Sequence, residues 1–167
     1  MLVPLVVSFL VSFVAPAGAA QASCLRPPVT APIVEHFESP PCPYCAGNRG
    51  IRFATARGAP VRAAASGVVV FAGWVVDTYY VVVRHGDGLR ATYGALADSP
   101  WRAGQVVAAG SLIGLAADRV YFGLRDEQDR YLDPEPLLGR LMVPPYLVPT
   151  DGTAARLPPQ PVLRCSG

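Results

Sequence analysis

Short runs of β-branched and aromatic residues, separated by glycine-containing turns, occupy residues 51–133. Residues 68–72, 79–84 and 120–124 are the strongest of these runs, and such residue types are enriched in β-strands. No window of this region shows a sustained helical period of apolar residues, so helices are expected to be short or absent. The pattern therefore predicts an all-β fold built mostly from antiparallel strands.

Weaker strand signals fill the intervals between these runs. Residues 74–76 and 89–93 are each rich in strand formers, and residues 105–114 are typical of a strand, a glycine turn and a second strand. The stretch His85-Gly-Asp-Gly88 supplies residues that tolerate positive φ, which favours a hairpin turn. In such a turn we expect His85 to be solvated.

The N-terminal end has the composition of a secretory leader. Residues 2–20 contain no charged side chain, and small residues fit an A-x-A cleavage pattern at 17–19 and at 20–22. We expect a signal peptide over residues 1–22 and export to the bacterial cell envelope or the medium. A retained membrane anchor is the alternative, because about 20 apolar residues suffice to span a bilayer. No contact with the membrane beyond the leader is expected.

Four cysteines are present, Cys24, Cys42, Cys45 and Cys165. An even number in an exported chain predicts two disulfides with three possible connectivities. We favour Cys24–Cys165, which would tie the two ends of the mature chain together, and Cys42–Cys45. Cys42-Pro-Tyr-Cys45 also spells the active-site tetrapeptide of glutaredoxins, so a thiol-disulfide oxidoreductase is an alternative. No helix pattern follows this motif, although a reactive C-x-x-C normally opens a helix, and this favours a local disulfide.

Composition divides the chain and excludes several functions. A proline-rich arm is expected over residues 23–47, a β-sheet core over 48–138 and an irregular proline-rich tail over 139–167. The formal net charge of +2 gives no basic footprint for nucleic acid. All the cationic side chains are arginine, and the absence of lysine excludes Schiff-base chemistry and lysine-tethered cofactors. No cofactor is expected.

Ordered landmarks run through the core over residues 47–138. They are Gly47-Asn-Arg-Gly-Ile-Arg-Phe-Ala54, Gly58-Ala-Pro-Val-Arg-Ala-Ala-Ala-Ser-Gly-Val-Val-Val-Phe-Ala-Gly-Trp74, Val83-Arg-His-Gly-Asp-Gly-Leu-Arg-Ala-Thr-Tyr93, Gly104-Gln-Val-Val-Ala-Ala-Gly-Ser-Leu-Ile-Gly114, Val120-Tyr-Phe-Gly-Leu-Arg125 and Tyr131-Leu-Asp-Pro134. In this order they resemble the lysostaphin/LytM-type zinc peptidoglycan endopeptidases. The resemblance implies a two-layer, mostly antiparallel β-scaffold with an open groove for the peptide bridge of peptidoglycan.

Active members of that family carry a Gly-His-Arg-Gly-x-Asp block, a His-x-His strand and an assisting histidine in a Tyr-x-His-Leu block. Carried over position by position, the zinc-binding His and Asp fall on Asn48 and Arg52, and the His-x-His pair falls on Arg119 and Tyr121. The assisting histidine falls on Ala95. Catalytic zinc needs three protein ligands with lone pairs, and a guanidinium offers none. The resemblance therefore implies an inactive homologue, a pseudoenzyme without a metal.

The predicted function is a non-catalytic envelope protein that binds peptidoglycan or regulates a cell-wall hydrolase. Asn48, Arg52, Arg119 and Tyr121 form the candidate groove for an anion or peptide, because arginine holds carboxylates in bidentate fashion. The alternative for the arginines is internal pairing with acidic residues, namely Asp118, Asp126 or Glu127. The alternative for the whole chain is an active zinc endopeptidase whose ligands come from His36, His85 and a distant carboxylate.

Overall fold

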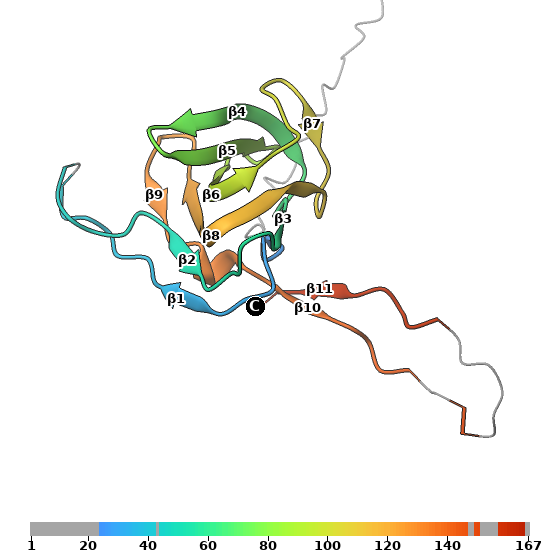
Figure 1. Cartoon of the computed structure of the whole chain (residues 1–167). Coiled ribbons are helices and arrows are strands. Elements are labelled where there is room, and N and C mark those ends of the chain that lie inside the picture. Colours follow the sequence, from blue (N-terminus) through green and yellow to red (C-terminus); the bar gives the residue numbers. More distant parts are fainter. Residues whose placement is uncertain (1–23, 43, 147–148, 151–156, 166–167) are drawn as a thin grey trace, which may run out of the picture.

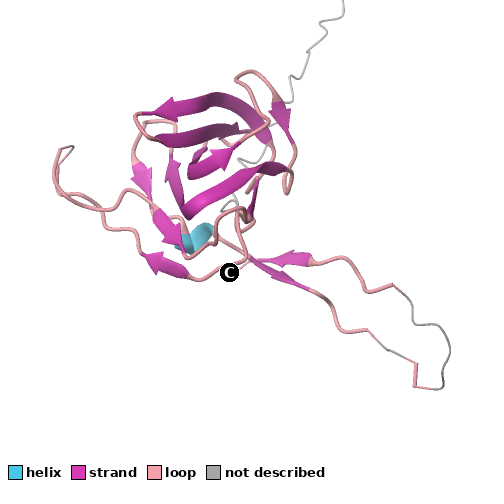
Figure 2. Ribbon diagram, viewed as in Figure 1, coloured by secondary structure: helices cyan, strands magenta, loops and turns pink. Residues whose placement is uncertain are grey.

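A curved β-sheet forms the body of the protein in the computed structural model, which describes residues 24–42, 44–146, 149–150 and 157–165 (Figures 1 and 2). The predicted signal peptide lies outside the described residues. The sheet has nine strands. They are β1 (Ile33–Glu35), β2 (Ile51–Phe53), β3 (Pro60–Arg62), β4 (Gly67–Val75), β5 (Thr78–His85), β6 (Arg90–Asp98), β7 (Val106–Val107), β8 (Leu112–Arg125) and β9 (Tyr131–Leu132).

Strand β8, with 14 residues, is the longest strand and organises the sheet. It pairs with β6 along one edge and with β3, β2 and β9 in succession along the other. The path of neighbouring strands is β1-β2-β8-β6-β5-β4-β7, and every pairing between these strands is antiparallel. The predicted all-β, mostly antiparallel fold is confirmed.

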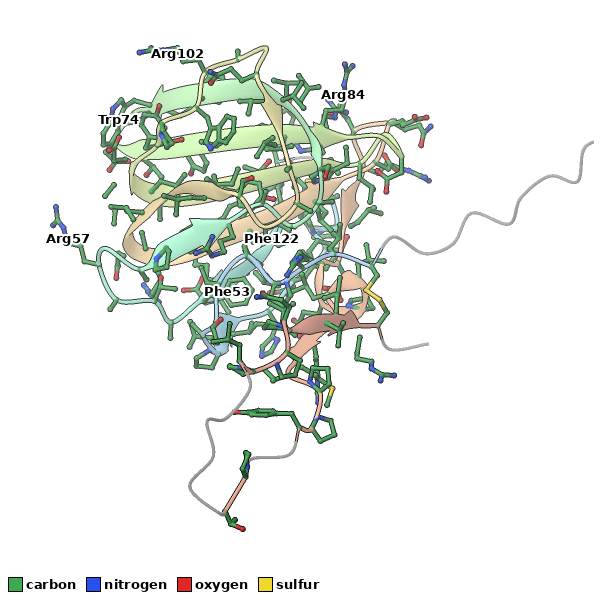
Figure 3. The ribbon with its side chains drawn as sticks, turned by 90° about the vertical axis from the view of Figure 1, so that its right-hand side faces the viewer. Phe53, Arg57, Trp74, Arg84, Arg102 and Phe122 are labelled. Atoms are coloured by element: carbon green, nitrogen blue, oxygen red, sulfur yellow. A yellow bond between two sulfur atoms is a disulfide. The ribbon has the colours of Figure 1, made fainter. Side chains whose placement is uncertain are left out.

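Alternation along the strands separates a core face from a solvent face. On β8, Val120, Phe122 and Leu124 are fully buried, whereas Tyr121 and Arg125 on the other face are partly exposed. The same period of two buries Val81 and Val83 on β5 and Ala91 and Tyr93 on β6. Figure 3 shows Phe53 and Phe122 inside the molecule and Arg57 and Arg102 projecting from its edge. Each large apolar side chain buried in this way contributes about 1.5–3 kcal/mol.

Tyr93 is the one tyrosine in the described core that is completely buried, and its hydroxyl has a specific partner. The backbone N–H of Ala64 donates to the Tyr93 hydroxyl over 2.7 Å. Burial raises the pKa of Tyr93 well above its ordinary value, because the ionised phenolate would lose its hydration. The hydrogen bond to Ala64 therefore ties β6 to the segment between β3 and β4.

In two places, runs that the sequence predicts as separate strands belong to one continuous strand in the structure. Residues 68–72 and 74–76 belong mostly to the single strand β4, since Gly73 pairs with Tyr80 of β5 without interrupting the ladder. Residues 112–114 and 120–124 belong to the single strand β8, and between them Leu115 pairs with β3 and β6 and Ala116 pairs with β6. The missing local signal at residues 115 and 116 is thus overcome by tertiary pairing, whereas the ladder between β6 and β8 is irregular between Ala116 and Tyr121.

The burial of His85 differs from its prediction. His85 is the last residue of β5 and is only 5% exposed, so the prediction of a solvated turn histidine was wrong. The inward positions of β5 are Val81 and Val83, and the same period of two carries His85 to the core side. Its Nδ1 lies 2.9 Å from the carbonyl oxygen of Ser66.

The tail also differs from its prediction. Residues predicted to be irregular form the antiparallel ribbon β10 (Arg140–Met142) and β11 (Val162–Arg164), which extends away from the body (Figure 1). A 3₁₀ turn, η1 (Glu135–Leu137), precedes it. Across the described ranges no helix is long and apolar enough to cross a membrane.

The cysteines are joined as Cys24–Cys165 and Cys42–Cys45, which is the connectivity favoured from the sequence. The first disulfide links the start of the described chain to the base of the β10–β11 ribbon. The second closes the tip of the loop between β1 and β2. Tyr44, between the two cysteines of that loop, is 98% exposed.

Candidate binding site

Two arginines share one carboxylate at the edge of the sheet. The Nε of Arg52 lies 3.0 Å from Oε2 of Glu35, and the Nη1 of Arg119 lies 2.8 Å from Oε1 of the same side chain. All three side chains are partly open to solvent, with exposed fractions of 38% for Arg52, 54% for Arg119 and 40% for Glu35. The cluster therefore carries one excess positive charge at a surface accessible to ligands.

Strand register places these side chains together. Glu35 on β1 is the partner of Arg52 on β2, and Arg52 is in turn the partner of Tyr121 on β8. Arg119 lies two residues before Tyr121 and so points to the same face of the sheet. Residues far apart in the chain thus meet because the proline-rich arm adds β1 to the edge formed by β2.

Tyr121 forms the floor beside this cluster. The guanidinium carbon of Arg52 lies 5.5 Å from the centre of its ring, and its hydroxyl donates to the carbonyl oxygen of Arg49 over 3.0 Å. A Cβ at Gly50 would stand only 2.8 Å from the ring, so glycine leaves the space that the tyrosine fills. Burial is the main cause that raises the pKa of Tyr121 to about 12.

Asn48 and Ala95 do not have the roles of the histidines that active peptidases carry at these positions. The side-chain amide of Asn48 donates to the carbonyl oxygen of His36 over 2.7 Å, and its backbone exchanges two hydrogen bonds with Glu38. Ala95 sits at a bulge of β6 with a φ of 57°. Of the predicted site residues, the structure brings Arg52, Arg119 and Tyr121 into one cluster and uses Asn48 to hold the arm.

The internal partners proposed from the sequence for the arginines were wrong. Asp126 binds Arg130 with 2.7 Å between Oδ2 and Nε, and among the described residues neither Asp118 nor Glu127 forms an ion pair with Arg52 or Arg119. Glu35 takes this role instead. The local sequence around Glu35 gives no sign of it, because β1 meets β2 only through tertiary folding.

A zinc ion, which the resemblance to the endopeptidases implies, does not fit these residues. The two guanidinium groups offer no lone pair and repel a dication, and the one carboxylate present is held by both of them. Within the described part of the chain there is no group of three or more His, Cys, Asp or Glu side chains that could hold a metal ion. His36 binds Glu135 over 2.7 Å and His85 faces Ser66, so each is engaged elsewhere.

A hollow that the sequence did not predict continues from Tyr121 along the same face. Its volume is about 200 Å³. It is lined by side chains of β5, β6, β8 and β9 and by one residue before β2, namely Tyr80, Thr92, Tyr121, Gly123, Leu124, Arg125, Tyr131 and Arg49. The alternation of β8 after Tyr121, which carries Gly123 and Arg125 to the same face, is the sequence signal that would have found it.

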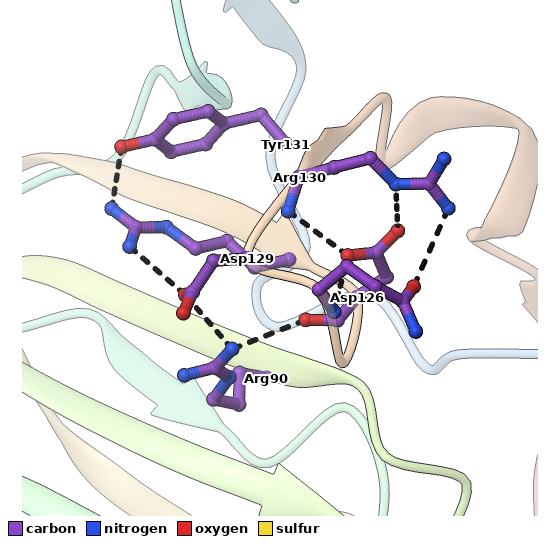
Figure 4. Close-up of polar contacts among 7 residues, drawn as sticks. Arg90, Asp126, Asp129, Arg130 and Tyr131 are labelled. Carbon is purple, nitrogen blue, oxygen red and sulfur yellow. Dashed lines mark hydrogen bonds and ion pairs between the residues drawn. The ribbon is translucent and has the colours of Figure 1, made fainter. Parts of the chain in front are cut away.

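A second cluster of charges borders this hollow at the β8–β9 turn (Figure 4). Asp129 accepts from Arg90 at 2.8 Å and from Arg125 at 3.4 Å. Asp126 binds Arg130, and hydrogen bonds to the backbone and side chain of Arg130 lower the pKa of that carboxyl below its ordinary value. Here too one carboxylate, that of Asp129, serves two guanidinium groups.

Comparison with known proteins shows that the chain matches a family of peptidases. Residues 46–134 match the family described as peptidase family M23. Uncharacterized protein Rv2891 of Mycobacterium tuberculosis and Uncharacterized protein Mb2915 of Mycobacterium bovis are each 38% identical over 93 residues, which cover 56% of this chain. The aligned region spans only about a third of these relatives, 36% of their length.

Solved structures share the fold at low sequence identity. Csd3 of Helicobacter pylori is 22% identical with a TM-score of 0.62 and is covered over 35% of its length by 70% of this chain. The catalytic domain of the antimicrobial peptidase lysostaphin from Staphylococcus simulans is 23% identical with a TM-score of 0.55, and the match covers 64% of this chain and 90% of the domain. A chain of the SpoIIQ-SpoIIIAH pore forming complex is 21% identical with a TM-score of 0.62, over 71% of this chain and 92% of the other.

Proposed function

This chain belongs to peptidase family M23, and from that premise we propose that it is a non-catalytic member that acts at the bacterial cell envelope. There it binds peptidoglycan or regulates a cell-wall hydrolase through the groove beside Arg52, Arg119 and Tyr121. The proposal includes the predicted division of the chain into a leader over 1–22, an arm over 23–47, a core over 48–138 and a tail over 139–167.

The shared ion pair of Glu35 with Arg52 and Arg119 is the observation that carries this proposal. Hydrolysis by a zinc enzyme needs a metal-bound water whose pKa is lowered by the dication. By the resemblance, Arg52 stands at the position of one zinc ligand and Arg119 at that of the assisting histidine of His-x-His, and both guanidinium groups stay protonated at every relevant pH. The same groups are well suited to hold a carboxylate.

The excess positive charge favours an anionic ligand. Stem peptides of peptidoglycan carry carboxylates, and so does an acidic loop of a partner protein. Glu35 must yield part of its contact with the arginines when such a group binds, and this exchange costs little because exposed ion pairs are worth about 0–1 kcal/mol. Binding is thus expected to weaken as salt concentration rises.

Retention on purified cell wall tests the proposal. The double variant R52A/R119A should sediment with insoluble peptidoglycan less than the wild-type protein. The variant R102A/R140A is the matched control, since it removes the same charge from two exposed arginines outside the groove. Equal retention of wild type and R52A/R119A would refute the role of this cluster.

Metal content separates the proposal from its enzymatic alternative. Protein purified without chelator should contain zinc well below one equivalent, and it should not cleave cross-linked peptidoglycan with added zinc. Stoichiometric zinc in the wild-type protein would contradict a metal-free site and favour the endopeptidase.

A further inference from the structure

The groove beyond Tyr121 consists of two hollows that meet at shared side chains. The hollow of about 200 Å³ described above shares Tyr80, Thr92 and Arg125 with a neighbouring open hollow of about 430 Å³. The second hollow lies farther along β8, toward the β8–β9 turn and away from Arg52. It is therefore separate from the position where the family binds zinc.

One wall of the larger hollow is apolar. Phe71 and Val75 of β4 and Val82 of β5 line it. Phe71 is 38% exposed and Val75 is 50% exposed, so both present apolar surface to solvent. A branched aliphatic side chain placed against this wall would remove that surface from water.

The opposite wall is cationic. Arg90 and Arg125 line the hollow, and Asp129 is the one carboxylate that both of them contact. Within the described residues Arg90 bonds through Nη2, which reaches Asp129 and the carbonyl oxygen of Asp126. Among the described residues no partner takes the Nε and Nη1 donors of Arg90, and Glu127 makes no ion pair with either arginine.

Polar groups lie between these walls. Tyr80 and Thr92 line both hollows, and neither hydroxyl has a hydrogen-bond partner within the described part of the chain. Hydroxyls in this place can bind the amide groups of a peptide backbone. The hollow thus offers an apolar wall, hydroxyl groups that can bind peptide amides, and two guanidinium groups.

We propose that this hollow binds the C-terminal residue of a peptide, with its carboxylate on Arg90 and Arg125 and its aliphatic side chain against Phe71 and Val82. A terminal residue carries both groups on one Cα, which suits walls that border the same small hollow. An acidic side chain within a longer peptide lacks the adjacent apolar group. The inference rests on the proposed wall-binding role only for the identity of the natural peptide.

Titration with short peptides tests this directly. The isotope-labelled full chain is titrated with N-acetyl-alanyl-leucine, with its C-terminal amide and with N-acetyl-glutamyl-leucinamide, and backbone NMR shifts report binding. The free acid should bind at least about tenfold more tightly than either amide, because charge-assisted hydrogen bonds are lost without the terminal carboxylate. Equal affinity for the acid and its amide would overturn the proposal, and so would preferential binding of the glutamyl amide.

Variants locate the site. R90Q and R125Q should each weaken binding of the acid at least fivefold and leave the weak binding of its amide unchanged, which also shows that the variants fold. D129N should strengthen binding of the acid, since it removes the internal carboxylate that competes for both arginines. R130Q is the matched control, because Arg130 is 74% exposed, lies in the same turn and does not line the hollow.

These readouts are independent of the proposed function. Retention on the cell wall without preference for the free acid would refute the peptide site and leave the wall-binding role standing. Binding of the acid that depends on Arg90 and Arg125, without retention on the cell wall, would support the peptide site and refute the wall-binding role. An increase of affinity in R90Q would contradict the assignment outright.

Discussion

Exchange of Glu35 for glutamine is the perturbation that most directly tests how the arginine cluster works. The side chain keeps its size and its hydrogen-bonding oxygen but loses the charge that Arg52 and Arg119 share. Two consequences with opposite signs are expected. The folded protein becomes less stable, while its binding of anionic ligands becomes tighter.

The size of both effects follows from exposure. The three side chains are between 38% and 54% exposed, so solvent screens their attraction. Exposed ion pairs contribute about 0.2–1 kcal/mol each, and the two pairs together give a loss of about 1 kcal/mol in the free energy of unfolding. An external carboxylate no longer has to displace Glu35, and the same 1 kcal/mol corresponds to about fivefold tighter binding.

Urea denaturation and cell-wall retention measure the two effects on one preparation. The difference in stability between E35Q and wild type should shrink in 1 M salt, where the Debye length is about 3 Å. E38Q is the matched control, because it removes a charge from the same arm, and Glu38 contacts Asn48 through its backbone. Retention of E35Q at or below that of wild type and E38Q would refute competition between Glu35 and the ligand.

Three further predictions concern stability. Val76 has a φ of 58° and is 96% exposed, so V76G should raise the free energy of unfolding by about 1 kcal/mol in urea denaturation, because a left-handed β-branched residue is strained. The disulfide Cys24–Cys165 spans a sequence separation of 141 residues, and C24S/C165S should lose up to about 5 kcal/mol on the chain-entropy scale, measured against wild type under non-reducing conditions. Tyr121 has a pKa raised to about 12, so its contribution to stability is complete below the unfolded value near 10 and is lost as pH rises toward 12. Y121F should therefore show a shallower loss of stability over that interval than wild type, although the pKa of Tyr93 is raised in the same sense.

The fold could be predicted because its signals are local. Runs of β-branched and aromatic residues, with glycine at the turns, are readable in 79–84 and 120–124 without any knowledge of partners. Where the signal fails, pairing decides. Leu115 and Ala116, for example, are strand because β3 and β6 supply their partners.

The clustering of the candidate site residues could be predicted only in part. Arg52, Arg119 and Tyr121 could be placed together because the resemblance fixes their positions on two strands that pair in register. Glu35 could not be placed, since it lies in the arm and meets Arg52 only through β1. The groove beyond Tyr121 was missed because its lining comes from several strands, and no short motif spans them.

The two charge clusters together suggest how a ligand binds this face. In each, one carboxylate serves two guanidinium groups, Glu35 at Arg52 and Arg119 and Asp129 at Arg90 and Arg125. Each cluster has an excess of positive charge, so it attracts an added anion. Each also contains an internal carboxylate, so the anion binds by partial exchange with that carboxylate. Replacement of Glu35 by glutamine and of Asp129 by asparagine should then each increase the affinity for an anionic ligand. The two gains should be independent of each other, because the clusters share no side chain. A gain in the double variant much smaller than the product of the single gains would mean that the two clusters bind one rigid ligand whose ends compete, and the description of two separate exchange sites would be wrong.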